Sequence, residues 1–249
     1  MVGRMGDYIR RGSAVATNMD LHLRELVEEK PTAPVYRVSD LPTIEDLRAI
    51  GIPNLSYDEN KNGGLFLDEC AAFLNSRSWN AKGREEIIVW LAHARKLGWD
   101  VFFQVQSLSM LDKQVRESFG EYIVTCGRLD RLKVPVIGRF AKMLTFGLWD
   151  GSMPKIHIAG VRYGTGPTAI LADRWTYRGV KLYNAYDTKQ KIGTNDCAVH
   201  SLIWYETAQE TEDRQAAAKR GPKPKLPDVA RLRSLPRDRQ WYWAKCLAA

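Results

Sequence analysis

Two adjacent carboxylates follow an apolar run and form the strongest candidate for chemistry in this sequence. The run Leu65–Leu67 is typical of a buried strand, and Asp68 and Glu69 come directly after it. In an open α/β sheet, ligands bind beyond the carboxyl ends of the strands. A carboxylate at that place can hold a magnesium ion through water while its neighbour orients or deprotonates an attacking water. This is a Walker B arrangement, although apolar runs that end in Asp-Glu also occur at ordinary strand exits.

Two glutamines end the next apolar run, Val101–Gln106. Gln104 and Gln106 are two residues apart, so on a strand their side chains point to the same face. An amide at a neighbouring strand end can sense a γ-phosphate or position a water, as a glutamine does in other nucleotide hydrolases. Strand-end glutamines also occur as plain turn residues, so this pattern supports the carboxylate site without proving it.

Three arginines are further candidates for phosphate contacts. Arg95, Arg116 and Arg128 occur in or next to predicted helices and strands, where a guanidinium can reach a phosphate or act as an arginine finger on a neighbouring subunit. Exposed arginines on helices and strand edges have the same sequence pattern.

Other expected parts of a nucleotide or metal site are missing. A phosphate-binding loop of the form G-x-x-x-x-G-K-[ST] requires a Gly-Lys dipeptide, and the sequence contains none. The stretch Gly164–Pro167 is not followed by a lysine and is predicted to be a hairpin turn. Cys197 and His200 are three residues apart, but two ligands do not close a tetrahedral zinc shell, so we predict no metal there.

Short apolar runs alternate with amphipathic helical patterns before residue 130, which predicts a parallel sheet with helices on its faces. The stretch Pro31–Pro53 contains four prolines and is expected to cross the surface, apart from one short helix. Strands are expected at 13–17, 65–67, 101–106 and 122–126. Helices are expected to end over 5–11 and to cover 43–49, 83–97 and 108–119. The strands from 65 onward, with the helices between them, form a βαβαβ series.

The rest of the chain changes in character. Residues 130–197 are predicted to be a β-rich part, because Lys155–Tyr163 alternates like an antiparallel strand. A helix over 198–219 then leads into a tail. Of the net charge of +8, the stretch 219–239 carries eight basic against two acidic residues, together with four prolines. The basic character therefore belongs to the tail.

Composition sets broad limits on the class of protein. The chain has 249 residues, of which 45% are hydrophobic and 27% charged, as in an ordinary globular protein. No apolar run of about 18 residues is present, and charged residues follow Met1 closely, so neither a membrane span nor a secretory signal is predicted. The four scattered cysteines are typical of a reducing compartment.

Several segments together resemble the zonular occludens toxin family, which comprises assembly and export ATPases of filamentous bacteriophages. They are Leu65–Cys70, Val89–Asp100, Val101–Gln106 and Leu111–Arg116, supported by Val15–Asn18 and Leu182–Thr188. The resemblance spans residues 3–190 in the order of the family. Family members begin with a strand and a Walker A loop that lead into a helix resembling Gly3–Arg11. We therefore expect this chain to start inside that helix, either through truncation or as a relic that has lost nucleotide binding.

The resemblance implies a P-loop NTPase fold of the RecA/ASCE-like type, with its first strand and P-loop missing, over residues 1–197. It implies ATP and magnesium as cofactors. It also implies roles for named residues: Asp68 would hold the magnesium shell, Glu69 would polarise the water, Gln106 or Gln104 would sense the γ-phosphate, and Arg95 or Arg116 would act across a subunit boundary in a ring. Without a Walker A loop, we expect little or no ATP hydrolysis by the chain as given.

The expected function is a motor for virion export, with phage coat and assembly proteins and the phage single-stranded DNA complex as partners. The expected location is the host cytoplasm, with possible contact to the inner membrane through 219–239 in place of the family's transmembrane helix. Two alternatives remain open. One is a non-catalytic subunit that binds phage DNA or a membrane through the basic tail, and the other is a DNA translocase of the related ring-ATPase type.

Overall fold

The computed structural model describes residues 1–56, 58–75, 83–128, 156–164, 168–178, 182–187, 190 and 201–220. The chain divides into two compact units, Met1–Tyr205 and Glu206–Ala249. In the second unit, helix α8 (Ala208–Arg220) is described. Its first turn is held by the hydroxyl of Thr211, which donates to the carbonyl of Thr207.

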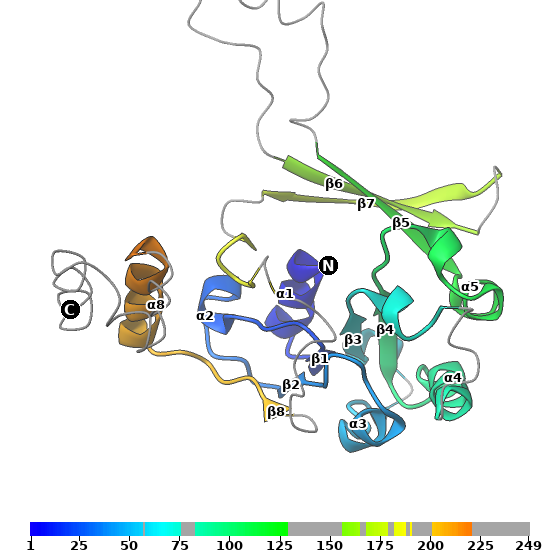
Figure 1. The fold of residues 1–249 in the computed structure, drawn as a ribbon, viewed down its shortest axis with the longest axis horizontal. Helices are drawn as coiled ribbons and strands as arrows, with labels where there is room; N and C mark the ends of the chain where they lie inside the picture. The colour runs from blue at the N-terminus through cyan, green and yellow to red at the C-terminus, as the bar shows by residue number, and fades with distance from the viewer. Residues whose placement is uncertain are drawn as a thin grey trace, which may run out of the picture. The chain divides into compact units, whose positions relative to one another are not determined.

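A five-stranded sheet with the order β4-β3-β1-β2-β8 forms the centre of the first unit (Figure 1). Strands β1 to β4 are parallel to one another, and the short strand β8 pairs antiparallel with β2. The strands are β1 (Val15–Thr17), β2 (Val35–Arg37), β3 (Gly63–Leu67), β4 (Trp99–Phe103) and β8 (Ser201–Leu202). The predicted α/β class with a mainly parallel sheet is therefore confirmed.

Helices cover both faces of this sheet, which explains why every residue of β1 and β3 is buried. Leu65 and Leu67 of β3 pack on one side with α3, α4 and α5, whereas Phe66 packs on the other side with α1 and α2. This alternation follows from the two-residue period of a strand. The helices are α1 (Val2–Arg10), α2 (Leu23–Leu26), α3 (Ile44–Ala49), α4 (Arg84–His93) and α5 (Lys113–Phe119).

Side-chain caps begin two of these helices. Thr43 and Asp46 form a capping box at the start of α3, and Asp112 caps α5 through the backbone N–H of Gln114. The helix predicted over 83–97 ends earlier, at His93, and a turn follows it. Short 3-10 helices supply the remaining turns, at η1 (Glu59–Lys61), η2 (Cys70–Ala72) and η4 (Leu108–Met110).

Three expectations for this sheet were wrong. One is the helix predicted over 198–219, because α8 begins only at Ala208 and Ser201–Leu202 pairs with β2 as strand β8. Strand β4 covers Trp99–Phe103, so Gln104 and Gln106 lie beyond the strand and not in it. The stretch Pro31–Pro53 contains α3 as expected, but it also contains β2, which pairs with β1 and β8 inside the sheet. The run Val35–Arg37 is short and includes an arginine, so its pattern did not indicate a strand. Ion pairs with Asp20 and Asp40 allow that arginine to be buried.

A separate antiparallel sheet has the order β5-β6-β7. It consists of β5 (Tyr122–Arg128), β6 (Ile156–Tyr163) and β7 (Ile170–Arg178). The antiparallel strand predicted near 155–163 is confirmed as β6, whereas β5 does not continue the parallel series as predicted. Gly164 opens the connection from β6 to β7 with a φ of 91°. Cys197 and His200, where no metal is predicted, lie outside the described residues, as does the predicted tail over 221–249.

The second sheet rests on helix α1. The hydroxyl of Tyr177 in β7 donates to Asp7 at 2.8 Å, and the guanidinium of Arg4 lies 4.8 Å from the ring centre of Trp175.

Among the described helices, none is long and apolar enough to cross a membrane.

Candidate functional site

The carboxyl ends of β1, β3 and β4 bring Asn18, Asp68 and Gln104 to one edge of the sheet. Gln104 continues the pairing of β4 with β3, because its N–H donates to the carbonyl of Leu67 at 2.8 Å and its carbonyl accepts from the N–H of Cys70 at 3.1 Å. The side chain of Gln104 is near the carboxylate of Asp68 and favours its ionised form. The structure thus brings together a carboxylate and an amide that sequence reasoning placed on neighbouring strand ends.

Asp68 is a half-buried carboxyl group. Burial raises the pKa of Asp68 above its usual value, although hydrogen bonds from the Glu69 N–H and the Gln104 amide, and the nearby amino group of Met1, act in the opposite direction. Burial without a full counter-charge disfavours the ionised form. A cation bound at this edge would therefore stabilise the carboxylate.

Glu69 has a left-handed backbone with a φ of 48°, and it is the only non-glycine residue with positive φ among the described residues. Its N–H donates to Oδ1 of Asp68 at 2.8 Å, and its side chain is exposed. The 3-10 helix η2 begins at the next residue, Cys70, whose thiol donates to the carbonyl of Leu67. Left-handed conformations of non-glycine residues are unfavourable and cluster at functional sites.

Asn18 fixes the position of Asp68. Its side chain accepts a hydrogen bond from the N–H of Asp68 at 2.8 Å and donates to the Asp68 carbonyl at 3.0 Å. The same amide donates to the carbonyl of Asp40 beyond β2 at 3.2 Å. Asn18 is fully buried, so these bonds connect the ends of three strands inside the protein. Sequence reasoning identified Asn18 only as part of a family segment and gave it no role.

The N-terminus of α1 lies on the same side as Asp68. The amino group of Met1 is buried, which lowers its pKa, and the charges of Cys126 and Asp68 act in the opposite direction. A helix N-terminus carries partial positive charge and free N–H groups, which suit an anion. The edge therefore brings a half-buried carboxylate and the N-terminus of a helix close to each other.

The segment 182–187 closes one side of this edge. Ala185 is fully buried, and its carbonyl accepts from the N–H of His22 at 2.8 Å. Gln190 donates to the carbonyl of Asn18 and accepts from the N–H of Asp20. Burial and the charge of Asp68 raise the pKa of Tyr186. This segment is distant in sequence, and only its resemblance to the family indicated a connection with the site.

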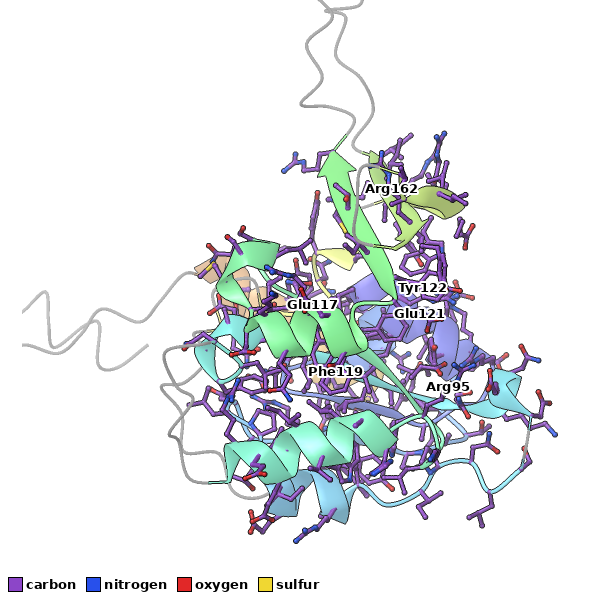
Figure 2. The ribbon with its side chains drawn as sticks, turned by 90° about the vertical axis from the view of Figure 1, so that its right-hand side faces the viewer. Arg95, Glu117, Phe119, Glu121, Tyr122 and Arg162 are labelled. Atoms are coloured by element: carbon purple, nitrogen blue, oxygen red, sulfur yellow. The ribbon has the colours of Figure 1, made fainter. Side chains whose placement is uncertain are left out.

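The other predicted site residues lie elsewhere. Arg95 precedes β4, so it lies at the amino edge of the sheet, opposite to Asp68, where it pairs with Glu59 at 2.7 Å (Figure 2). Arg116 is half-buried on α5 and donates to the carbonyl of Leu108 at 3.3 Å. Gln106 is exposed two residues beyond Gln104. Arg128 ends β5, paired in register with His157.

The chemistry of the donor set fits magnesium better than zinc. The described residues contain no group of three His, Cys, Asp or Glu side chains that could enclose an ion. Magnesium usually retains several waters and binds one or two carboxylates together with substrate phosphates. Asp68 and Glu69 can supply the carboxylates of such a site, whereas a cradle for the phosphates is missing from the sequence.

Comparison with known proteins places these residues in a family. A family model described as "Zonular occludens toxin (Zot)" matches residues 2–150. The Gene 1 protein of Enterobacteria phage M13 is 47% identical over 206 residues, which cover 81% of this chain and 59% of that protein. The Gene 1 proteins of Escherichia phage If1 and Salmonella phage IKe are 44% and 45% identical, with 86% and 78% of this chain and 61% and 53% of theirs covered.

The chain spans only about half to three-fifths of the length of these relatives. In addition, the N-terminal domain of zonular occludens toxin from Neisseria meningitidis aligns with a TM-score of 0.39 and 15% identity, over 70% of this chain and 80% of that domain. The fold described above rests on the strand order of this chain itself. From the family model and the identity to the three Gene 1 proteins, it follows that this chain belongs to the zonular occludens toxin (Zot) family.

Proposed function

We propose that this chain is the main part of an ATP-driven motor domain that assembles and exports filamentous phage. The observation that carries the proposal is the meeting of three groups at one edge of the sheet: the Asp68 carboxylate, Gln104 beside it, and the N-terminus of α1. Membership of the Zot family and the similarity to the Gene 1 proteins of filamentous phages support the biological role.

Each residue at this edge has a role in the proposed reaction. Asp68 holds the water shell of a magnesium ion, which would supply charge stabilisation for phosphoryl transfer. Glu69 accepts a proton from, or orients, the attacking water, and its exposed side chain leaves room for that water. Gln104 orients the Asp68 carboxylate and contacts the terminal phosphate. Gln106 is the less favoured choice, because it lies farther from the strand end.

A phosphate cradle would have to come from residues that this sequence lacks. Among the described residues, β4 pairs only with β3, so its other edge is open to a further parallel strand. A strand at that place could lead through a Gly-rich Gly-Lys loop into the N-terminus of α1, next to Asp68. The open edge and the position of α1 therefore support a P-loop NTPase fold with its first strand and loop supplied upstream.

The experiment compares magnesium-dependent ATP binding and hydrolysis in three proteins. These are the chain as given, a form extended through the upstream reading frame, and the extended form with Glu69→Gln. We expect activity only in the extended form, with hydrolysis lost and ATP binding retained after substitution of Glu69. A folded extended form that neither binds nor hydrolyses ATP would contradict the proposal.

A second function has one observation in its favour, the absence of any Gly-Lys dipeptide. A chain without a cradle can act as a non-catalytic subunit on the same fold, bound to other copies, to phage DNA or to the inner membrane through the basic stretch 219–239. In a ring of motor subunits, Arg95 at the amino edge would act only on a neighbouring subunit. Cross-linking of the extended form with and without ATP distinguishes a ring from a monomer.

A further inference from the structure

The antiparallel sheet β5-β6-β7 has one face packed on the protein and one face open. Residues that are paired in register lie on the same face of a sheet. Trp175 and Tyr177 therefore share a face with His157, and these side chains contact Arg4, Asp7 and Tyr183 of the rest of the unit. The opposite face, which we call the outer face, includes the aligned set Ile123, Arg162 and Leu171.

The arginines, threonines and Leu171 of the outer face are exposed, and its isoleucines are half-buried. A Cβ added to Gly127 would meet no atom within 4 Å, and one added to Gly160 would meet only Leu171. Leu171 itself is 51% exposed. The described residues of the outer face are Ile123, Thr125, Gly127, Ile156, Ile158, Gly160, Arg162, Leu171, Arg174, Thr176 and Arg178.

The charge of the outer face is of one sign. Arg162, Arg174 and Arg178 are exposed, and none of the described residues on this face is acidic. Figure 2 shows Arg162 on this sheet. An aliphatic centre with a cationic rim is the composition that lies at the boundary between lipid headgroups and acyl chains.

The side chains favour lipid over nucleic acid. Proteins that bind single strands through a sheet stack the bases on exposed aromatic rings. In this sheet the described aromatic side chains lie on the face opposite to the outer face, where Tyr122 and Tyr163 are 54% and 53% exposed. The described residues of the outer face include no ring on which a base could stack. The outer face offers only isoleucine, leucine, threonine and glycine between its arginines.

We propose that the outer face of β5-β6-β7 docks on an anionic membrane surface. None of the residues of the outer face belongs to the basic stretch 219–239. The proposed docking does not depend on nucleotide binding, so it stands or falls independently of the motor activity.

The test measures co-sedimentation of the full chain with vesicles of phosphatidylglycerol and phosphatidylcholine, beside vesicles of phosphatidylcholine alone. The test variant is R162Q/R174Q/R178Q, and the matched control is R10Q/R48Q/K113Q, which removes the same charge from exposed positions elsewhere. Because a basic residue near an anionic surface contributes about 1 kcal/mol, the test variant should bind about 100-fold more weakly than the control. The basic tail is identical in both.

A second variant tests the apolar contribution without changing charge. Leu171→Ser should weaken vesicle binding about 5-fold, because half of a leucine side chain would no longer enter the boundary region. Circular dichroism and urea midpoints establish that each variant is folded. The proposal would be overturned if the test variant and the control variant bound the anionic vesicles equally. It would also be overturned if the wild type bound vesicles of phosphatidylcholine alone as strongly as anionic ones. Loss of oligothymidylate binding with vesicle binding intact would assign the face to nucleic acid instead.

Discussion

Asn18 and Asp68 exchange two hydrogen bonds, from the Asp68 N–H to Oδ1 of Asn18 at 2.8 Å and from Nδ2 of Asn18 to the Asp68 carbonyl at 3.0 Å. The side chain of Asn18 thus pairs with the Asp68 backbone as a further strand residue would. It extends the pairing of β1 with β3 by one step beyond the end of both strands. The sheet therefore fixes the backbone of Asp68, although Asp68 follows the last residue of β3.

Asn18→Ala should lower the free energy of unfolding by about 2–3 kcal/mol, because it leaves the buried N–H and carbonyl groups of its partners without hydrogen bonds. Urea denaturation measures this change. Asn18→Asp should cost more at neutral pH, because it loses both donated bonds and adds a buried charge beside Asp40. Asn60→Ala, at an exposed position, is the control and should stay within about 0.5 kcal/mol of the wild type. A similarly small effect for Asn18→Ala would show that the hydrogen bonds of Asn18 do not fix the backbone of Asp68.

Glu69→Gly should raise the free energy of unfolding by about 1 kcal/mol, because glycine adopts a left-handed backbone without steric cost. Gly51 allows the reverse substitution, in which a side chain is added to a left-handed glycine. It has a φ of 68°, and an added Cβ would meet no atom within 4 Å. Gly51→Ala should therefore destabilise the protein by about 1 kcal/mol through conformation alone. Thermal and urea unfolding measure the free energy of unfolding of both variants. If Glu69→Gly were less stable than the wild type, the contacts of the glutamate side chain would outweigh the cost of its left-handed backbone.

The sequence predicted those parts of the fold that local pattern determines. Leu65–Leu67 is apolar and ends in two acids, and 83–97 repeats apolar residues with a helical period, so β3 and α4 could be predicted. The proximity of Asp68 and Gln104 followed from the rule that parallel strand ends meet at one edge. That rule uses only the direction of the strands and no side-chain contact.

Other features depend on contacts between distant segments. The amino-edge position of Arg95 depends on where α4 ends, which the helical period alone does not determine. Strand β2 is stabilised by the pairing of Arg37 with Asp20 and Asp40, and this compensation has no local pattern. The direction of β5 follows from its pairing with β6, beyond the stretch 129–155. Tyr186 reaches the site only because Ala185 is bonded to His22.

Asp68→Asn should stabilise the protein increasingly as the pH rises. The pKa of Asp68 is raised in the folded state, so the carboxyl group stabilises the fold below its unfolded pKa of about 3.9, and this contribution is lost as the pH rises through the folded value. The stability difference between variant and wild type should therefore grow above pH 4 and then level off. Urea denaturation from pH 3.5 to 8 measures it.

Glu59→Gln is the control of opposite sign. Arg95 lowers the pKa of Glu59, so this variant should lose a small amount of stability above the normal glutamate pKa. The loss should disappear as the pH falls through the lowered pKa of the folded state. The group is exposed, and the effect should fade with added salt. A pH-independent difference for Asp68→Asn would mean that Asp68 is as well solvated in the folded chain as in the unfolded one.

Gly3→Ala tests whether β7 rests on α1 in solution. In an isolated helix this change gains about 1 kcal/mol. Here the new Cβ would lie 2.5 Å from Cδ1 of Tyr177, so the ring must move away from the helix and weaken its bond to Asp7. We therefore expect a loss of about 1–3 kcal/mol. In a Tyr177→Leu background the ring is absent, and the same change should cost little or become favourable. Urea denaturation of the four proteins of this cycle gives the coupling, which should exceed about 1 kcal/mol for residues in contact. A gain from Gly3→Ala in the wild-type background would mean that the second sheet does not press on the helix whose N-terminus lies near Asp68.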